Sequence, residues 1–272
     1  HIATCEPPKL ALEGGGKAAS KEVGGNQVGG GNAILNTGLS EAEIWEQLPE
    51  VKVIQKFSEA WTEKVLSEPK WVEKKEKLEV LDKALNVPKI EPANYTHITK
   101  MIKKLLTESS IPIHMCCFSI LKKLCKGLRK NFSQGFKSLN RSLLLKLKDR
   151  KPLVTDSVME TISEGLQCVG LEDVIDEFKD QLKEKNPFTK TNILTIICQH
   201  IQSNGAKCVK NQPLCKSLVG NAKENLNDGA PEVRKASMDI LVALLKCAPK
   251  DPLIQKELGT IEEKKRKKII EL

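Results

Sequence analysis

The sequence predicts an all-α fold in which about six helix pairs stack into an α-solenoid, a flat elongated paddle. Apolar residues recur at spacings of three and four from about residue 54 onward, as in Leu78, Leu81 and Leu85. This is the period of an amphipathic helix. The alternation of apolar and polar residues that is typical of strands is missing. Prolines recur at near-regular intervals, which indicates a repeat architecture.

Short clusters of Pro, Gly, Asn and Asp divide this pattern into ten or eleven expected helices. They span about 54–66, 71–86, 92–107, 112–130, 134–148, 153–168, 171–184, 188–203, 211–226, 231–247 and 251–270. The last range holds only one or two short helices, so we expect the sixth pair to be incomplete.

Prolines open every second expected helix, where the missing N–H of proline would have had no partner. They are Pro69, Pro112, Pro152, Pro187 and Pro231, with separations of 43, 40, 35 and 44 residues. A helix pair every 40 or so residues is the period of HEAT and armadillo arrays. Residues 228–234, Asp-Gly-Ala-Pro-Glu-Val-Arg, fit the start of the second helix of a HEAT repeat. The narrow range of separations disfavours the alternative, a chain of unrelated antiparallel helices.

The N-terminal region differs from the rest of the chain. Residues 1–40 carry nine of the 17 glycines and lack apolar periodicity, so we predict a flexible Gly-rich linker there. The repeat domain is expected over 41–272. A short capping helix is expected at 41–50, with Ser40 and Glu43 forming a capping box and Trp45 covering the end of the solenoid.

The net charge of +9 is unevenly distributed, because the first 50 residues carry three Lys and seven Glu. A body this basic suggests nucleic acid, an anionic membrane or an acidic protein as partner. Aromatic residues make up only 4% of the chain, which is few for a module that stacks bases. No run of about 18 apolar residues is present to span a membrane.

If the helix pairs stack, the proline-bearing turns all lie on one long edge, a surface that suits a large partner. Four of these five turns carry a cation. Trp71 in the first turn either packs inward between layers or forms an exposed anchor, a frequent role of tryptophan at interfaces. Trp61 is in period with Phe57 and Leu66, so we expect it in the core.

Four segments resemble parts of a TOG domain in order and spacing. Residues 70–79, Lys-Trp-Val-Glu-Lys-Lys-Glu-Lys-Leu-Glu, resemble the K-W-x-E-R-K-E-A-L opening, and 126–132 resemble the G-L-R-x-x-F turn of the second repeat. Residues 151–156 resemble the third-repeat loop, and 227–234 the N-D-x-x-P-x-V-R loop of the fifth. The match is most similar to the second TOG domain of the microtubule polymerase family, which includes ch-TOG, Minispindles and MOR.

The resemblance implies a six-layer HEAT paddle that binds curved αβ-tubulin through one edge. By position, Trp71 matches the loop tryptophan that inserts against β-tubulin, and Ile111 matches its aliphatic support. The later basic residues imply contacts that reach α-tubulin. The tubulin-binding residues implied or placed beside them are Trp71, Lys70, Ser110, Ile111, Lys151, Asn186, Lys190, Arg234 and Lys235.

Three residues depart from the family pattern and bear on affinity. Ser110 stands where Asn is usual, Pro112 is unusual in its loop, and Lys235 stands where an acidic residue is common. The resemblance also implies one unit of a plus-end growth factor, located in the cytoplasm on microtubules, spindle poles and centrosomes. Growth promotion then needs several tethered TOG domains, and the Gly-rich segment fits a linker between two of them.

We expect no catalytic site, metal or cofactor. The glycines of 14–31 lack the context of a phosphate-binding loop. The nine cysteines form no CxxC pair, and Cys198 and His200 do not share a helix face, so buried reduced cysteines are expected. The adjacent Cys116 and Cys117 beside His114 are interpreted in the same way, against a thiol nucleophile.

Two other functions remain open from the residues alone. One is a HEAT-repeat adaptor for another acidic protein. The other is a nucleic-acid-binding helical repeat, including an enzyme of the alkyl-base-excision kind, whose affinity would fall steeply with salt. The basic run at 262–268 is either a nuclear-import or lattice-contact patch or, as we favour, a solvated helix end.

Overall fold

The computed structural model describes residues 40–272, and the predicted linker over 1–39 lies outside the described residues. Residues Glu41–Leu272 form one compact unit. Within it the regular secondary structure is helical, with short 3-10 turns and one isolated β-bridge between Val51 and Ile90, so the all-α prediction is confirmed. No helix among these residues is long and apolar enough to cross a membrane.

The helices follow one another as a single N-terminal helix and then six pairs. They are α1 (Glu41–Gln47), α2 (Glu59–Ser67) with α3 (Trp71–Ala84), α4 (Thr96–Leu105) with α5 (Ile111–Leu128), α6 (Ser133–Lys146) with α7 (Pro152–Cys168), α8 (Ile175–Leu182) with α9 (Pro187–Lys210), α10 (Gln212–Asn225) with α11 (Pro231–Cys247), and α12 (Pro252–Gly259) with α13 (Glu263–Glu271).

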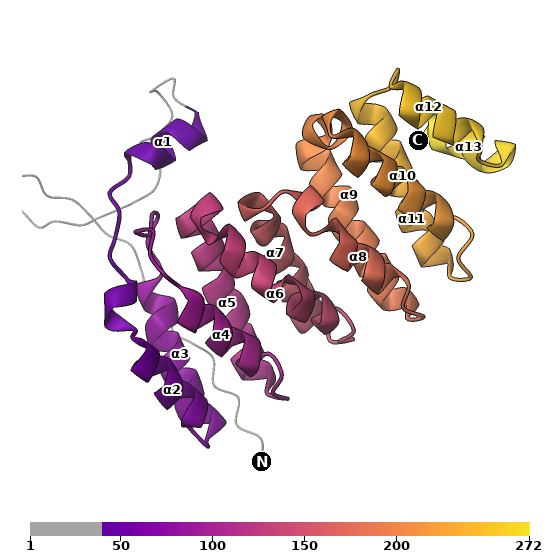
Figure 1. The fold of residues 1–272 in the computed structure, drawn as a ribbon. Helices are drawn as coiled ribbons and strands as arrows, with labels where there is room; N and C mark the ends of the chain where they lie inside the picture. Colours follow the sequence, from indigo (N-terminus) through magenta and orange to yellow (C-terminus); the bar gives the residue numbers. More distant parts are fainter. Residues whose placement is uncertain (1–39) are drawn as a thin grey trace, which may run out of the picture. The chain divides into compact units, whose positions relative to one another are not determined.

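The pairs stack as the solenoid prediction requires. The second helices α3, α5, α7, α9 and α11 pack against one another in chain order, and the first helices α2, α4, α6 and α8 form a second row. The turns inside the first five pairs lie at the same end of the pairs, the lower side in Figure 1. A chain of unrelated helices would not repeat this arrangement.

Three expected helices differ from those observed. The helix expected at 54–66 is a 3-10 turn followed by α2, which begins after Ser58, whose Oγ accepts a hydrogen bond from the Trp61 amide. The helix expected at 188–203 ends at a kink at Asn204, which has non-helical φ and ψ, and a second helical segment then runs to Lys210. The helix expected at 171–184 is a 3-10 turn, Leu171–Asp173, followed by α8. The last range holds two short helices, as expected, because α12 ends at Gly259.

The segment of α9 after the kink approaches α11 closely. A Cβ built on Gly205 would lie 2.0 Å from the Sγ of Cys247, so only glycine fits there without movement of Cys247. Periodicity within one helix cannot reveal this contact, because Cys247 is far away in the sequence.

The core continues through the stack and fixes the start of the second helices. The third residue of α5, α7, α9 and α11 is almost fully buried in every case: Ile113, Val154, Thr189 and Val233. Burial of this position orients the first turn of each helix, so that the residues before it lie at the surface.

Candidate functional site

The residues that precede the second helices share one backbone conformation. Lys70, Ser110, Lys151, Asn186 and Ala230 all have φ between −93° and −76° and ψ between 108° and 127°. Five equivalent helix starts therefore repeat along one side of the stack. We call this surface, made of the turns before α3, α5, α7, α9 and α11 and the first turn of each helix, the turn edge.

The first layer presents an exposed aromatic side chain. Trp71 is the first residue of α3 and exposes 51% of its surface, so the alternative of inward packing is wrong. Lys70 beside it pairs with Glu73, with 3.0 Å between Nζ and Oε1. Trp61 instead packs on the core, edge to face with Phe57, as expected.

The second layer supplies a half-buried aliphatic residue. Ile111 packs against the core while Ser110 before it is half-buried. Pro112 is the second residue of α5, and Ser110 has the same extended conformation as its counterparts in the other layers. Proline is tolerated in the first helical turn, so this departure leaves the shape of the turn intact.

The third layer carries a cation without an ion-pair partner among the described residues. Lys151 is exposed, and its backbone N–H donates to Asp149 Oδ1 at 2.9 Å. Thr155 Oγ1 donates to the Asp149 carbonyl oxygen at 2.7 Å. The turn is thus held by hydrogen bonds to Asp149, and the Lys151 ammonium remains available.

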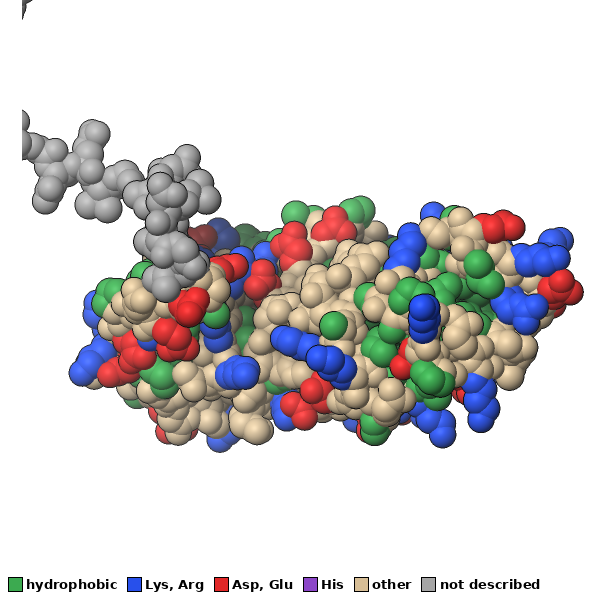
Figure 2. Space-filling model, turned by 90° about the horizontal axis from the view of Figure 1, so that it is seen from above, with side chains coloured by type: hydrophobic (Ala, Val, Ile, Leu, Met, Phe, Trp, Pro, Cys, Tyr) green, Lys and Arg blue, Asp and Glu red, His purple; other side chains and the backbone are tan. Residues whose placement is uncertain are grey.

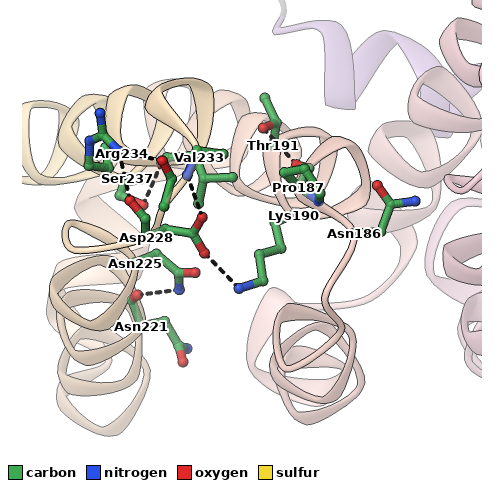
Figure 3. Close-up of polar contacts among 12 residues, drawn as sticks. Asn186, Pro187, Lys190, Thr191, Asn221, Asn225, Asp228, Val233, Arg234 and Ser237 are labelled. Carbon is green, nitrogen blue, oxygen red and sulfur yellow. Dashed lines mark hydrogen bonds and ion pairs between the residues drawn. The ribbon is translucent and has the colours of Figure 1, made fainter.

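The fourth and fifth layers are joined by a lysine that was predicted to face outward. Lys190 Nζ lies 2.7 Å from Asp228 Oδ2, and both side chains are more than four-fifths buried. Asp228 Oδ1 also accepts a hydrogen bond from the Ala230 amide at 2.9 Å. These two donors hold the pKa of the Asp228 carboxyl below its usual value. Figure 3 shows the Lys190 side chain directed toward Asp228.

Arg234 is likewise engaged with its own turn. Its Nη1 donates to the carbonyl oxygens of Asp228 and Gly229, both at 2.8 Å, as Figure 3 shows for Asp228. Lys235 next to it is exposed and forms no ion pair with a described residue. Asn186 uses its Oδ1 to accept from the Phe188 amide at 3.0 Å.

A shared position explains these contacts. Lys190 and Arg234 are each the fourth residue of their helix, and in each of the first five layers this residue binds a turn: Lys74, His114, Thr155, Lys190 and Arg234. We call these five residues the brace residues. The sequence analysis did not identify Lys74, His114 and Thr155 as site residues, although all five occupy the same position relative to the start of their helix.

Two brace residues of the early layers meet at Glu108. Lys74 Nζ contacts its carboxylate at 2.7 Å, and His114 Nε2 donates to its carbonyl oxygen at 2.8 Å. Lys74 is buried apart from 7% of its surface. Burial and the nearby Lys146 ammonium lower the pKa of His114, so the ring is neutral at neutral pH.

The opposite edge, seen from above in Figure 2, carries acidic and basic side chains interspersed with hydrophobic ones. Trp45 of α1 lies there between two cations, with Lys89 Nζ 4.8 Å and Arg129 Cζ 4.5 Å from its ring centre. Its Nε1 donates to the Pro88 carbonyl oxygen at 3.3 Å. Arg129 adopts a φ of 48°, the one positive φ of a non-glycine residue in the described region.

The cysteines are consistent with a packing role. Six of the eight described cysteines are buried, with Cys116 half-buried and Cys247 exposed. Burial raises the pKa of Cys198 and of Cys208 to about 11, so both are thiols at neutral pH. No group of three or more His, Cys, Asp or Glu side chains within residues 40–272 could hold a metal ion.

Known proteins show similarity over most of the described unit. Protein MOR1 of Oryza sativa subsp. japonica is 32% identical over 206 residues, which cover 75% of this chain and 10% of the relative. The chain therefore spans about a tenth of that relative's length. No protein-family model matches the chain.

Solved structures share the fold. A structure from work on microtubule plus-end tracking by XMAP215, CLIP-170 and EB1 is 29% identical, with a TM-score of 0.75, and the match covers 84% of this chain and 95% of that one. A second, from work on tubulin recruitment and assembly by microtubule polymerases with TOG domain arrays, is 22% identical with a TM-score of 0.71, over 83% of this chain and 47% of that one. The expected solenoid of HEAT-like pairs is confirmed.

Proposed function

Because the chain belongs to the TOG-domain family that includes protein MOR1, we propose that it is a tubulin-binding module that serves as one unit of a microtubule polymerase. The dimer of curved αβ-tubulin binds along the turn edge. The whole protein then acts on microtubules and spindle poles in the cytoplasm, and several such modules on one chain raise the local concentration of tubulin. The described unit binds its partner and performs no chemistry on it.

The exposure of Trp71 is the observation that carries this proposal. A tryptophan at the start of a helix with 51% of its surface exposed costs free energy in water and gains it when a partner covers the ring. Tryptophan is also enriched among the residues that dominate binding energy. The half-buried Ile111 of the next layer extends this apolar contact.

Exposed cations supply the electrostatic part. Lys151 and Lys235 lie on the same edge without ion-pair partners among the described residues. Such cations raise the rate of association with an acidic protein and orient it. We place β-tubulin at the Trp71 end and α-tubulin at the Lys235 end. Lys190 and Arg234 act mainly by holding the fourth and fifth turns, and contribute to binding through that geometry.

Gel filtration of the chain with unpolymerised αβ-tubulin tests the proposal. We expect a co-eluting complex for the wild type. We expect one also for the control variant Trp45→Ala, which removes a tryptophan from the opposite edge. Trp71→Ala should lower the affinity at least 30-fold, the loss typical of a central anchor. Absence of a wild-type complex at micromolar concentration and low salt would exclude tubulin as the partner.

A further inference from the structure

The second residues of α7 and α9 are apolar and lie at the surface. Leu153 exposes 68% of its surface and Phe188 exposes 36%. Each stands between a proline that opens the helix and a buried third residue, Val154 or Thr189. Because the neighbouring residues fix the first turn, these two side chains project from the turn edge.

The same position is apolar in four of the five layers. Val72 of α3 exposes 46% of its surface, Pro112 of α5 is half-buried, and only Glu232 of α11 is charged. Single exposed apolar residues are common on protein surfaces and need no explanation. A row of them in one register along one edge, next to Trp71, is the kind of feature that marks an interaction surface.

Cations flank this row in the middle layers. Arg150 and Lys151 precede Leu153 in the third turn, and Lys185 precedes Phe188 in the fourth. All three cations are exposed and form no ion pair with a described residue. The middle of the edge therefore matches a partner surface that is acidic around an apolar centre, and it lies on the same edge as Trp71.

We propose that Leu153 and Phe188 are further contact residues for the αβ-tubulin dimer, an inference that rests on the proposed function. With these two residues, the middle of the turn edge contacts tubulin through apolar side chains as well as through charges. Salt does not screen apolar contacts. At physiological ionic strength it does screen the interactions between exposed charges that lie more than about 8 Å apart. The complex should therefore keep a part of its affinity that salt does not remove.

Tubulin affinity at two salt concentrations tests this with Leu153→Ser, Phe188→Gln and the double variant. We expect each single variant to lower the affinity about fivefold to 30-fold, the range that corresponds to 1–2 kcal/mol, at both salt concentrations. Lys151→Ala should instead lose most of its effect at the higher salt. Val80→Ser is the matched control, since Val80 is an aliphatic residue that exposes 58% of its surface and lies toward the end of α3, away from its first turn.

The outcomes separate the two proposals. If Trp71→Ala abolishes binding but the Leu153 and Phe188 variants match Val80→Ser, the inference falls and the proposed function stands. If the wild type forms no complex with tubulin, both fall. If the free chain self-associates and the double variant does not, the row serves a second copy of the chain, which also overturns the inference. Unchanged helical circular dichroism excludes misfolding as the cause of any loss.

Discussion

Lys190 on α9 and Asp228 in the turn before α11 form an ion pair across two layers, with 2.7 Å between Nζ and Oδ2. The pair is largely shielded from water, and Asp228 also accepts the Ala230 amide. It therefore holds the turn before α11 against the first turn of α9. A basic residue that resembled a contact residue from its sequence position is, in the structure, part of the frame that shapes the turn edge.

Removal of this pair should destabilise the fold. We expect Lys190→Ala to lower the free energy of unfolding by about 1–2 kcal/mol, between the value of an exposed pair and that of a charged hydrogen bond. Urea unfolding measures it. Lys183→Ala is the matched control, because its pair with Asp180 is exposed and should contribute little. Equal stability of the two variants would show that Lys190 does not brace the turn.

The same pair predicts acid sensitivity. The folded-state pKa of Asp228 is lowered by the Lys190 hydrogen bond and the Ala230 amide from an ordinary value of 3.8. Its stabilisation is therefore present above that value and is lost as the pH falls below it. The free energy of unfolding of Asp228→Asn should lie further below that of the wild type at pH 5 than at pH 3. A constant difference over that interval would contradict the assignment.

His114 predicts a second pH dependence. Burial and Lys146 lower its folded-state pKa from 6.5, so the unfolded chain binds the proton more tightly. Stability is then full above pH 6.5 and falls as the pH drops below it. His114→Gln should reduce the difference in urea midpoint between pH 7.5 and pH 5.5. His200, whose pKa burial also lowers, accounts for the dependence that remains. An unchanged difference in the variant would rule out a buried neutral His114.

Thr189 offers a stabilising substitution. Its Oγ1 is buried without a hydrogen-bond partner, while valine occupies the equivalent third position of α7 and α11. Thr189→Val removes an unpaired buried hydroxyl and should raise the free energy of unfolding by about 1 kcal/mol. The reverse change, Val233→Thr, should lower it. A lower melting temperature for Thr189→Val would indicate a partner that the hydroxyl needs.

Gly165 should resist enlargement. A Cβ at this position in α7 would lie 1.8 Å from a ring carbon of Phe136, which is itself fully buried. We expect Gly165→Ala to destabilise the chain by about 1–3 kcal/mol, as overpacking does. Phe136→Leu in the same chain should recover part of that loss. Independent, additive effects of the two changes would contradict a direct clash.

The parts of the fold that depend on local sequence were predictable. Leucine spacing and the recurring prolines located the helix pairs, and the near-regular separations of the prolines placed the turns on one edge. Two features were not predictable for a common reason. The close packing of α9 on α11 at Gly205 involves Cys247, and the role of Lys190 depends on Asp228. Both partners lie 38 or more residues away, and a basic side chain looks the same in sequence whether it is paired or free.

The central claim is that tubulin binds the turn edge, and photo-crosslinking tests it most directly. A photoreactive amino acid is placed at position 72 or 235 on that edge, or at position 130 on the opposite one; all three native residues are exposed. We predict crosslinks to β-tubulin from position 72, to α-tubulin from position 235, and none from position 130. Crosslinks from position 130 without any from 72 or 235 would contradict the account.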